Sequence, residues 1–345
     1  MRIPLLPALR GRVRIVKMTK CRCFRFVAGC HAARPDSGDK AMPQQLPQPE
    51  IQRLRWLARR QKEIADLPVM EKRRRRWAAV KEAAPGARPV FTLEHWTFNR
   101  DFMPASLLEC QTPLGRQLEQ RMLEHIRHHE IIDDDLPCPG HLDAGWHLRY
   151  DEFGGLRIPV TRARDAEGVE TAYHYDCPIK DLAIDPIDFL DHPPAWSVDR
   201  EATADEIRFL EELLGDLLPV RLVGWAPGAH NLTGRVIRLM DQAAFFVAMH
   251  EAPEKLRRVM RYLTDSAVQY DRWAEREGLL GVTNGGLPPA GARLGDMWVY
   301  MESQETVGVS PAFFAEFCFP YYREIAELFG HVYWGCCEPD RKSVV

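Results

Sequence analysis

The sequence lacks the features of a membrane protein and of a disulfide-stabilised secreted domain. No apolar run in its 345 residues approaches the roughly 18 residues that a membrane helix needs. Cys21, Cys23 and Cys30 lie near the start, Cys336 and Cys337 are adjacent near the end, and the rest of the nine cysteines are scattered singly. Such spacing favours reduced thiols in a cytoplasmic protein over a disulfide framework.

An excess of charge of one sign is absent as well. The formal net charge is -3 and charged residues make up 28% of the chain, so the overall balance predicts neither nucleic acid nor a membrane surface as a partner. The run Arg73–Arg76 has no aromatic residues interleaved, which predicts a solvated helix face rather than a phosphate-binding patch. A hydrophobic content of 46% is enough for a sizeable core.

Acidic residues are missing from the first 35 positions, which hold nine Arg or Lys before Asp36. This composition is similar to that of a transit peptide, although the serine-rich character is missing. We prefer a start assigned too far upstream, with initiation at Met42, over a basic arm for an anionic surface. We therefore expect a basic, Pro-rich extension at residues 1–49, disordered or wrongly started, and a domain at residues 50–345.

Hydrophobic periodicity predicts how this domain is built. Helical spacing is found at residues 50–66, in a second helix that ends near residue 84, and at residues 112–129, 203–217, 231–250, 253–277 and 310–329. Short apolar runs predict strands at residues 88–93, 131–135, 220–224, 279–283, 297–301 and 331–334. Residues 145–178 alternate between polar and apolar, which predicts a hairpin inserted into this series.

The alternation of strands and helices predicts the α/β class, with a parallel sheet and right-handed crossovers. No Gly-rich phosphate loop follows the first strand, which argues against a dinucleotide-binding open sheet. A TIM (β/α)8-type barrel is the alternative, and its eight strands compare with about six here. We therefore expect a barrel that is truncated after about the sixth strand, before the abrupt tail Arg341–Val345.

A family resemblance is carried by the residues before and after the last strand. Ser310 to Tyr321 fit the pattern Ser-Pro-x-x-Phe-x-x-Phe-x-x-Pro-Tyr. This segment resembles the one in the uroporphyrinogen decarboxylase-like superfamily, which includes corrinoid-dependent methyltransferases. The strand end Gly335–Pro339 is similar to the Gly-Cys-Cys-Glu-Pro of decarboxylase-like members. Further agreement covers residues 218–221 and 239–265, and the resemblance spans residues 50–339.

The resemblance implies a single-domain barrel enzyme that acts on a small-molecule substrate. One known chemistry of the superfamily is metal-free decarboxylation of porphyrinogen acetate arms, and the other is zinc-assisted methyl transfer between a thiol and a corrinoid. Methyl transfer implies a corrinoid protein as partner, and homodimers occur in the superfamily. A fold does not determine which of these reactions a protein catalyses, so the choice between them depends on the residues at the site.

Zinc- and corrinoid-linked methyl transfer is the function that we prefer. The resemblance implies Cys336 as a metal ligand, and Cys337 and Glu338 are candidate replacement ligands, because thiolates and carboxylates bind zinc. A departure is Trp334, which stands where the methyltransferases have His; either cysteine can instead pack in the barrel wall as a small apolar residue. Trp225 and Trp334 are candidate cofactor-binding residues, as a wall for a flat ligand or corrinoid, or they fill the core.

Three further residues at strand ends are candidate catalytic residues. Glu302 and Glu305 follow one predicted strand, where they contact substrate or metal; pairing of a carboxylate with Arg293 is the structural alternative. His230 lies on the loop after another strand and is a candidate pocket residue, whereas a lone loop histidine is often structural.

Two other functions stay open. Metal-free uroporphyrinogen decarboxylation needs a central Asp and cationic residues, but Asp133–Asp135 do not reproduce that motif and Arg59–Arg60 is a poor match. The acidic run is equally interpreted as a solvated loop or helix cap. An inactive, truncated fragment is the last alternative, because an unclosed barrel leaves strand edges exposed.

Overall fold

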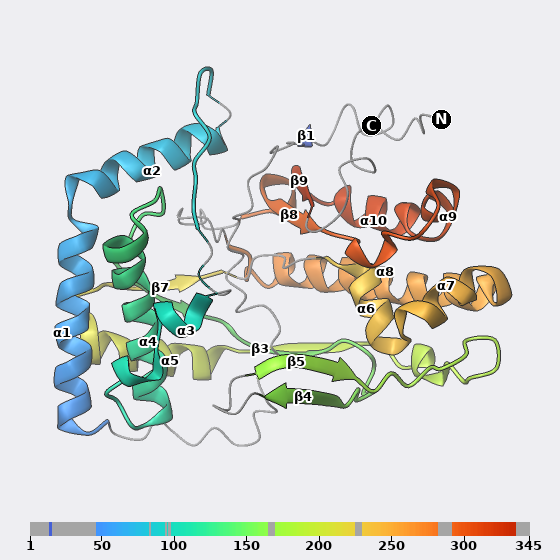
Figure 1. Ribbon diagram of the computed structural model, residues 1–345, viewed down its shortest axis with the longest axis horizontal. Helices are drawn as coiled ribbons and strands as arrows, with labels where there is room; N and C mark the ends of the chain where they lie inside the picture. The colour runs from blue at the N-terminus through green and yellow to red at the C-terminus, as the bar shows by residue number, and fades with distance from the viewer. Residues whose placement is uncertain are drawn as a thin grey trace.

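The structure is a computed structural model, and it describes residues 14–15, 46–82, 84–93, 95, 98–164, 170–224, 230–281 and 292–335. Within these ranges the chain is a mixed α/β protein, which confirms the predicted class (Figure 1). The described strands do not form a closed barrel. None of the helices in these ranges is long and apolar enough to cross a membrane.

Helices make up most of the described chain. Near the amino end they are α1 (Gln48–Ala65), α2 (Pro68–Lys81), the short α3 (Asn99–Phe102) and α4 (Pro113–Arg127). Further along the chain they are α5 (Arg200–Leu214), α6 (Leu232–Leu239), α7 (Gln242–Glu251), α8 (Pro253–Arg276), α9 (Pro311–Phe317) and α10 (Phe319–Ala326). The predicted helices are confirmed, except that the two predicted at 231–250 and 310–329 are each broken in two.

Each break has a local cause. Met240 takes an extended conformation after α6, and the side chain of Asp241 then accepts a hydrogen bond from Ala244 N and caps α7. Pro320 stands in the first turn of α10, where its missing N–H costs no helical hydrogen bond. The same proline would remove a hydrogen bond from a continuous helix, so α9 ends at Phe317.

Parallel strands form two separate sheets among the described residues. Strand β2 (Leu142–Gly145) pairs with β7 (Val220–Val223), and β8 (Trp298–Met301) pairs with β9 (His331–Trp334). The outer edge of β9 pairs with β1 (Arg14–Ile15), again in parallel. These pairings confirm the strands predicted at residues 220–224, 297–301 and 331–334.

The strand predicted at residues 279–283 is described only as far as Gly281. At that point the chain passes beside the end of β7, because Gly224 lies against the backbone of Leu280 and Gly281. A Cβ atom on Gly224 or Gly281 would overlap the other residue's backbone. The two glycines therefore allow the chain after α8 to approach β7 closely.

Antiparallel pairs form two further sheets. Strand β3 (His147–Asp151) pairs with β6 (Ala195–Asp199), and β4 (Val160–Arg164) pairs with β5 (Glu170–Tyr175), which confirms a hairpin within residues 145–178. The strand predicted at 88–93 is wrong, since those residues have no regular structure. The strand predicted at 131–135 is also wrong: a π-helical turn, His128–Ile132, ends there in a left-handed Asp133 with φ of 48°.

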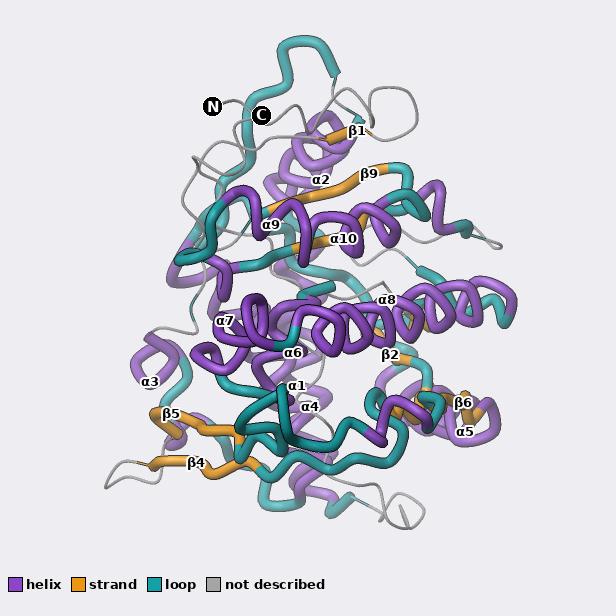
Figure 2. The backbone as a smooth tube through the Cα atoms, turned by 90° about the vertical axis from the view of Figure 1, so that its right-hand side faces the viewer, coloured by secondary structure: helices purple, strands orange, loops and turns teal. Residues whose placement is uncertain are grey.

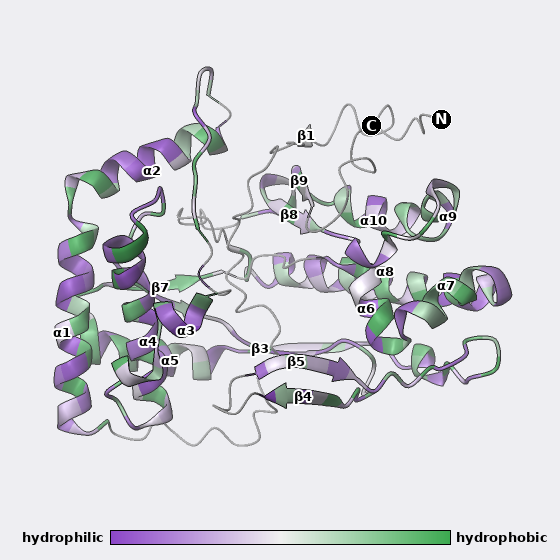
Figure 3. Cartoon of the chain, in the orientation of Figure 1, coloured by the Kyte–Doolittle hydropathy of each residue, from purple (hydrophilic) through white to green (hydrophobic). Residues whose placement is uncertain are grey.

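Two hydrophobic clusters hold these elements together. One joins α6–α10 to β8 and β9, with the long α8 packed along it (Figure 2). The other joins α1, α4 and α5 to β2. Helix α1 has alternating apolar and polar faces, whereas α2 is polar through its middle (Figure 3). The apolar face of α1 includes Leu54 and Leu57, both fully buried, whereas its Trp56 is 54% exposed.

We expect Leu57→Ala to lower the free energy of unfolding by about 2–5 kcal/mol, because it leaves a cavity between α1 and its neighbours. Trp56→Ala on the adjacent position is the matched control and should cost less than about 1 kcal/mol, since Trp56 packs mainly under Arg53 at the surface. Urea unfolding followed by circular dichroism measures both. Equal losses for the two variants would contradict the assignment of this face to the core.

Candidate functional site at the end of strand β8

The side chains on the two faces of β8 differ in burial, and this difference shows on which face Glu302 follows the strand. Val299 and Met301 are fully buried in the helix-covered cluster. Side chains alternate along a strand, so Tyr300 points to the opposite face. The hydroxyl of Tyr300 donates to Glu302 Oε2 at 2.7 Å, so the carboxylate of Glu302 lies beside Tyr300.

Asn231 joins Glu302 to Glu305. Its Nδ2 donates to Glu302 Oε1 at 2.9 Å and to Glu305 Oε1 at 3.2 Å. Its Oδ1 accepts from Gly234 N at 2.6 Å, which caps the first turn of α6. That capping bond requires an oxygen, so it fixes which end of the amide faces the carboxylates. Asn231 therefore holds two acidic side chains together with the two N–H donors of one amide group.

Residues around Glu302 and Glu305 donate further hydrogen bonds to them. Thr233 Oγ1 donates to Glu305 Oε2 at 2.7 Å, and Gln242 Nε2 donates to Glu305 O at 2.7 Å. Tyr322 donates to Glu302 O at 2.6 Å and accepts from Thr233 N at 3.1 Å. Burial raises the pKa of the Tyr322 hydroxyl well above its usual value of 10, which keeps it a neutral donor. We refer to Asn231, Thr233, Glu302, Glu305 and Tyr322 as the carboxylate cluster.

His230 lies on the other side of the sheet. Its backbone N–H donates to Tyr300 O at 2.9 Å, and the residue is paired with Met301. It therefore shares the helix-covered face of Met301, and its Nε2 lies 2.9 Å from Asp271 Oδ2 of α8, off the line of a straight hydrogen bond. The histidine is 3% exposed and the aspartate fully buried. The structure thus places His230 in a buried pair between sheet and helix, turned away from Glu302.

Trp334 lies on the same helix-covered side. The register pairs it with Met301, and its ring meets those of Tyr322 at 5.0 Å and Phe314 at 6.3 Å, edge to face. Of the two interpretations of this residue, these contacts favour core filling over a wall for a flat ligand. Trp225, the other candidate cofactor-binding residue, lies outside the described residues.

Asn231, Thr233 and Tyr322 are the members of the carboxylate cluster that the sequence analysis did not select, and two of them have a signal in the sequence. Asn231 directly precedes a predicted helix, where an asparagine is a common cap, and that signal locates it at the strand end. Tyr322 directly follows the Pro-Tyr of the segment that carries the family resemblance. Neither signal indicates that the side chains contact Glu302 or its neighbours.

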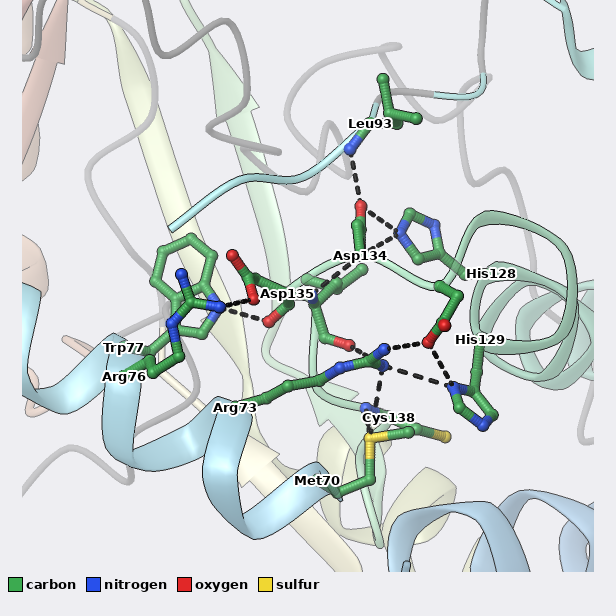
Figure 4. Close-up of polar contacts among 12 residues, drawn as sticks. Met70, Arg73, Arg76, Trp77, Leu93, His128, His129, Asp134, Asp135 and Cys138 are labelled. Carbon is green, nitrogen blue, oxygen red and sulfur yellow. Dashed lines mark hydrogen bonds and ion pairs between the residues drawn. The ribbon is translucent and has the colours of Figure 1, made fainter. Parts of the chain in front are cut away.

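A second polar cluster joins α2 to the end of α4 (Figure 4). Arg73 is only 4% exposed, so the solvated face expected for Arg73–Arg76 is wrong at this position. Its guanidinium lies 2.6 Å from Asp133 Oδ1, 3.1 Å from Leu136 O and 3.3 Å from His129 Nδ1. The other arginines of the run pair as Arg74–Glu71, Arg75–Glu71 and Arg76–Asp135.

Asp134 is the centre of this second cluster. Its carboxylate lies 3.0 Å from His128 Nε2 and accepts from Leu93 N at 2.6 Å and from Leu136 N at 2.8 Å. Burial alone would raise the pKa of Asp134, but the His128 side chain and the two backbone N–H groups outweigh it and lower the pKa. Asp134 thus anchors two loops and is not a solvated loop residue, and the structure gives it a structural role.

Metal binding stays a prediction. Cys336, Cys337 and Glu338 lie outside the described residues. Within the described ranges, no group of three or more His, Cys, Asp or Glu side chains is arranged to hold a metal ion. Glu302 and Glu305 follow β8, the neighbour of the strand that precedes Cys336 in the sequence, and their oxygens already accept hydrogen bonds.

A scan against models of protein families found no match to this chain, and searches among curated proteins and solved structures found none either.

We expect Asn231→Asp to destabilise the fold by at least about 1–3 kcal/mol at neutral pH, because a third carboxylate replaces the donor between Glu302 and Glu305. An aspartate can still cap α6, whereas Asn231→Ala loses cap and donor without adding charge, and serves as the control. Chemical unfolding at neutral and acidic pH measures both. In acid, the free energy of unfolding of the Asp variant should approach that of the Ala variant. If the Asp variant is less stable by the same amount at both pH values, charge repulsion is not the cause.

Asp134→Asn should change how stability depends on pH. Since folding lowers the Asp134 pKa, ionised Asp134 stabilises the wild type above the unfolded pKa of about 3.9, and this contribution disappears as the pH falls through the folded value. The free-energy difference between wild type and variant is thus expected to be largest near neutrality and to shrink in acid. Asp216→Asn, at an exposed ion pair with Arg55, is the control and should change little.

Proposed function

We propose that this chain is an enzyme of the uroporphyrinogen decarboxylase-like superfamily, of TIM-barrel type, that transfers a methyl group in a zinc- and corrinoid-linked reaction. The proposed site lies at the carboxyl ends of β8 and β9. Active sites of (β/α) barrels are built at this end of the strands, which is consistent with the position of the carboxylate cluster.

One observation carries the proposal. Gly335 N donates to Met301 O at 3.1 Å, so the end of β9 is bonded to the end of β8. Glu302 follows Met301 directly, and Cys336, Cys337 and Glu338 follow Gly335 directly. The segment Cys336–Glu338, which supplies two thiols and a carboxylate, therefore continues from a strand end that is hydrogen-bonded to the strand end before Glu302. Asn231 holds Glu302 and Glu305 together at that second strand end.

The donor set suits zinc. Cys336 and Cys337 would provide soft thiolates, and Glu338 with Glu302 would provide carboxylate oxygens, all of which are ligand types that zinc accepts. Zinc bound there would lower the pKa of a substrate thiol and make it a nucleophile near neutral pH. Two hydrogen bonds position Glu302: Asn231 donates to one carboxylate oxygen and Tyr300 to the other.

Other assignments follow from the contacts. His230 is paired with Asp271 on the far face of the sheet, so we propose that it supports the sheet rather than reacts. Trp225 is the remaining aromatic candidate for contact with a corrinoid. The aspartates of the run Asp133–Asp135 are paired with Arg73, His128 and Arg76. Because these carboxylates already have partners within the chain, metal-free decarboxylation is the second candidate.

The test is zinc content together with methyl transfer from methylcobalamin to a simple thiol. We expect about one zinc per chain in the wild type and loss of both zinc and transfer in Cys336→Ser and Cys337→Ser. Cys177→Ser is the matched control, because Cys177 is a buried free cysteine whose Sγ contacts Ile237 O. Full transfer by zinc-free protein, or by both cysteine variants, would contradict the proposal; turnover of uroporphyrinogen without metal would favour decarboxylation.

Tyr300→Phe tests the support of the site without removing a ligand. It deletes the hydroxyl that donates to Glu302 Oε2 and keeps the ring. Loss of an outer hydrogen bond of this kind weakens metal binding by about 10–100-fold, so zinc affinity should fall in that range while the unfolding transition stays in place. An unchanged zinc affinity would remove Glu302 from the proposed ligand set.

A further inference from the structure

A small polar pocket lies between α1, α4 and the start of β2. Its volume is about 50 Å³. It adjoins the amino end of β2, whereas the carboxylate cluster follows the carboxyl end of β8, so the two are separate sites. The lining residues are Gln61, Arg121, Met122, His125, Pro139, His141, Leu142 and Asp143.

Gln61 presents an acceptor to this pocket. The residue is fully buried. Its Nε2 donates to Pro139 O at 2.8 Å, and that bond fixes the amide so that Nε2 faces the carbonyl group. Its Oε1 is buried and has no hydrogen-bond partner among the described residues. A buried amide oxygen without a donor costs about 1–3 kcal/mol, which points to a ligand that donates a hydrogen bond to it.

The charged residues give the pocket a positive balance. Asp143 Oδ1 lies 3.2 Å from His141 Nε2 and 3.3 Å from Arg221 Nη2. Burial would raise the pKa of Asp143, but His141, Arg221 and Arg121 outweigh it and lower the pKa, so the carboxylate is ionised. Arg221 forms an ion pair with that carboxylate. Arg121 donates to the backbone oxygen of Asp143 at 2.5 Å, so two arginines accompany the one carboxylate.

We propose that this pocket binds a small oxyanion that carries a hydroxyl group, such as hydrogen phosphate or bicarbonate. Arg121 supplies charge and N–H donors for the anionic oxygens, and Gln61 Oε1 accepts the hydroxyl. The volume is sufficient for a small anion. The inference goes beyond the proposed methyl transfer and does not depend on it.

Calorimetric titration with hydrogen phosphate, bicarbonate and sulfate, at neutral pH and constant ionic strength, tests the proposal. Sulfate matches phosphate in size but carries no proton at neutral pH, so it cannot donate to Gln61. We expect hydrogen phosphate or bicarbonate to bind at least about tenfold more tightly than sulfate, the factor that one hydrogen bond of about 1.4 kcal/mol gives. The tighter of the two identifies the anion. Binding of neither, or sulfate binding equally well, would overturn the proposal.

Two variants locate the binding. Arg121→Gln should abolish it, while Arg127→Gln should not, although Arg127 also lies on α4 and donates to a backbone oxygen, that of Phe102. Gln61→Met keeps the size of the side chain and removes the acceptor, so it should abolish the preference over sulfate. Circular dichroism confirms that each variant is folded. If Arg121→Gln does not fold, the loss of anion preference in Gln61→Met decides, and unchanged preference there would overturn the assignment.

Discussion

The orientation of a single amide, that of Asn231, determines how the end of the sheet is arranged. One end of this amide caps α6 through Gly234 N, and the other holds Glu302 and Glu305. Helix α6, the segment after β8 and the two acidic side chains therefore depend on one another. An aliphatic residue at this position would leave the first turn of α6 uncapped and both carboxylates without their common donor.

The alternation of side chains along a strand separates two residues that are neighbours in sequence. His230 lies on the helix-covered face with Asp271, and Asn231 on the face of Glu302. The stable packing of α8 and the chemistry at the strand end thus lie on opposite sides of one chain segment. Substitution of Asp271 would act on the site only through the backbone that both residues share.

Much of the fold follows from local signals in the sequence. Helices with a strong apolar face, such as α4 and α8, and strands bounded by turns, such as β8, are found where periodicity predicts them. Residues 131–135 look like a strand because Ile131 and Ile132 are adjacent, yet the chain forms a π-helical turn there, and the following aspartates make tertiary contacts with Arg73 and Leu93. Long-range partners of this kind leave no periodic pattern.

The candidate site was only partly predictable for the same reason. Glu302 and Glu305 were found because they follow a predicted strand, but Asn231 is more than sixty positions earlier, and only the folded chain brings it to them. Arg73 illustrates the opposite error. Four consecutive arginines suggest exposure, and nothing local distinguishes the one that is buried against Asp133.

The pairing of β1 with β9 has a practical consequence for the protein in solution. Residues 14 and 15 cover backbone groups at the outer edge of β9, at the positions of His331 and Val332. A polypeptide that begins at Met42 would present that edge to solvent, and exposed strand edges of this kind template pairing with other chains. The colloidal behaviour of the protein therefore depends on which start residue is chosen for its production, even though the first forty residues lie far in sequence from the carboxylate cluster.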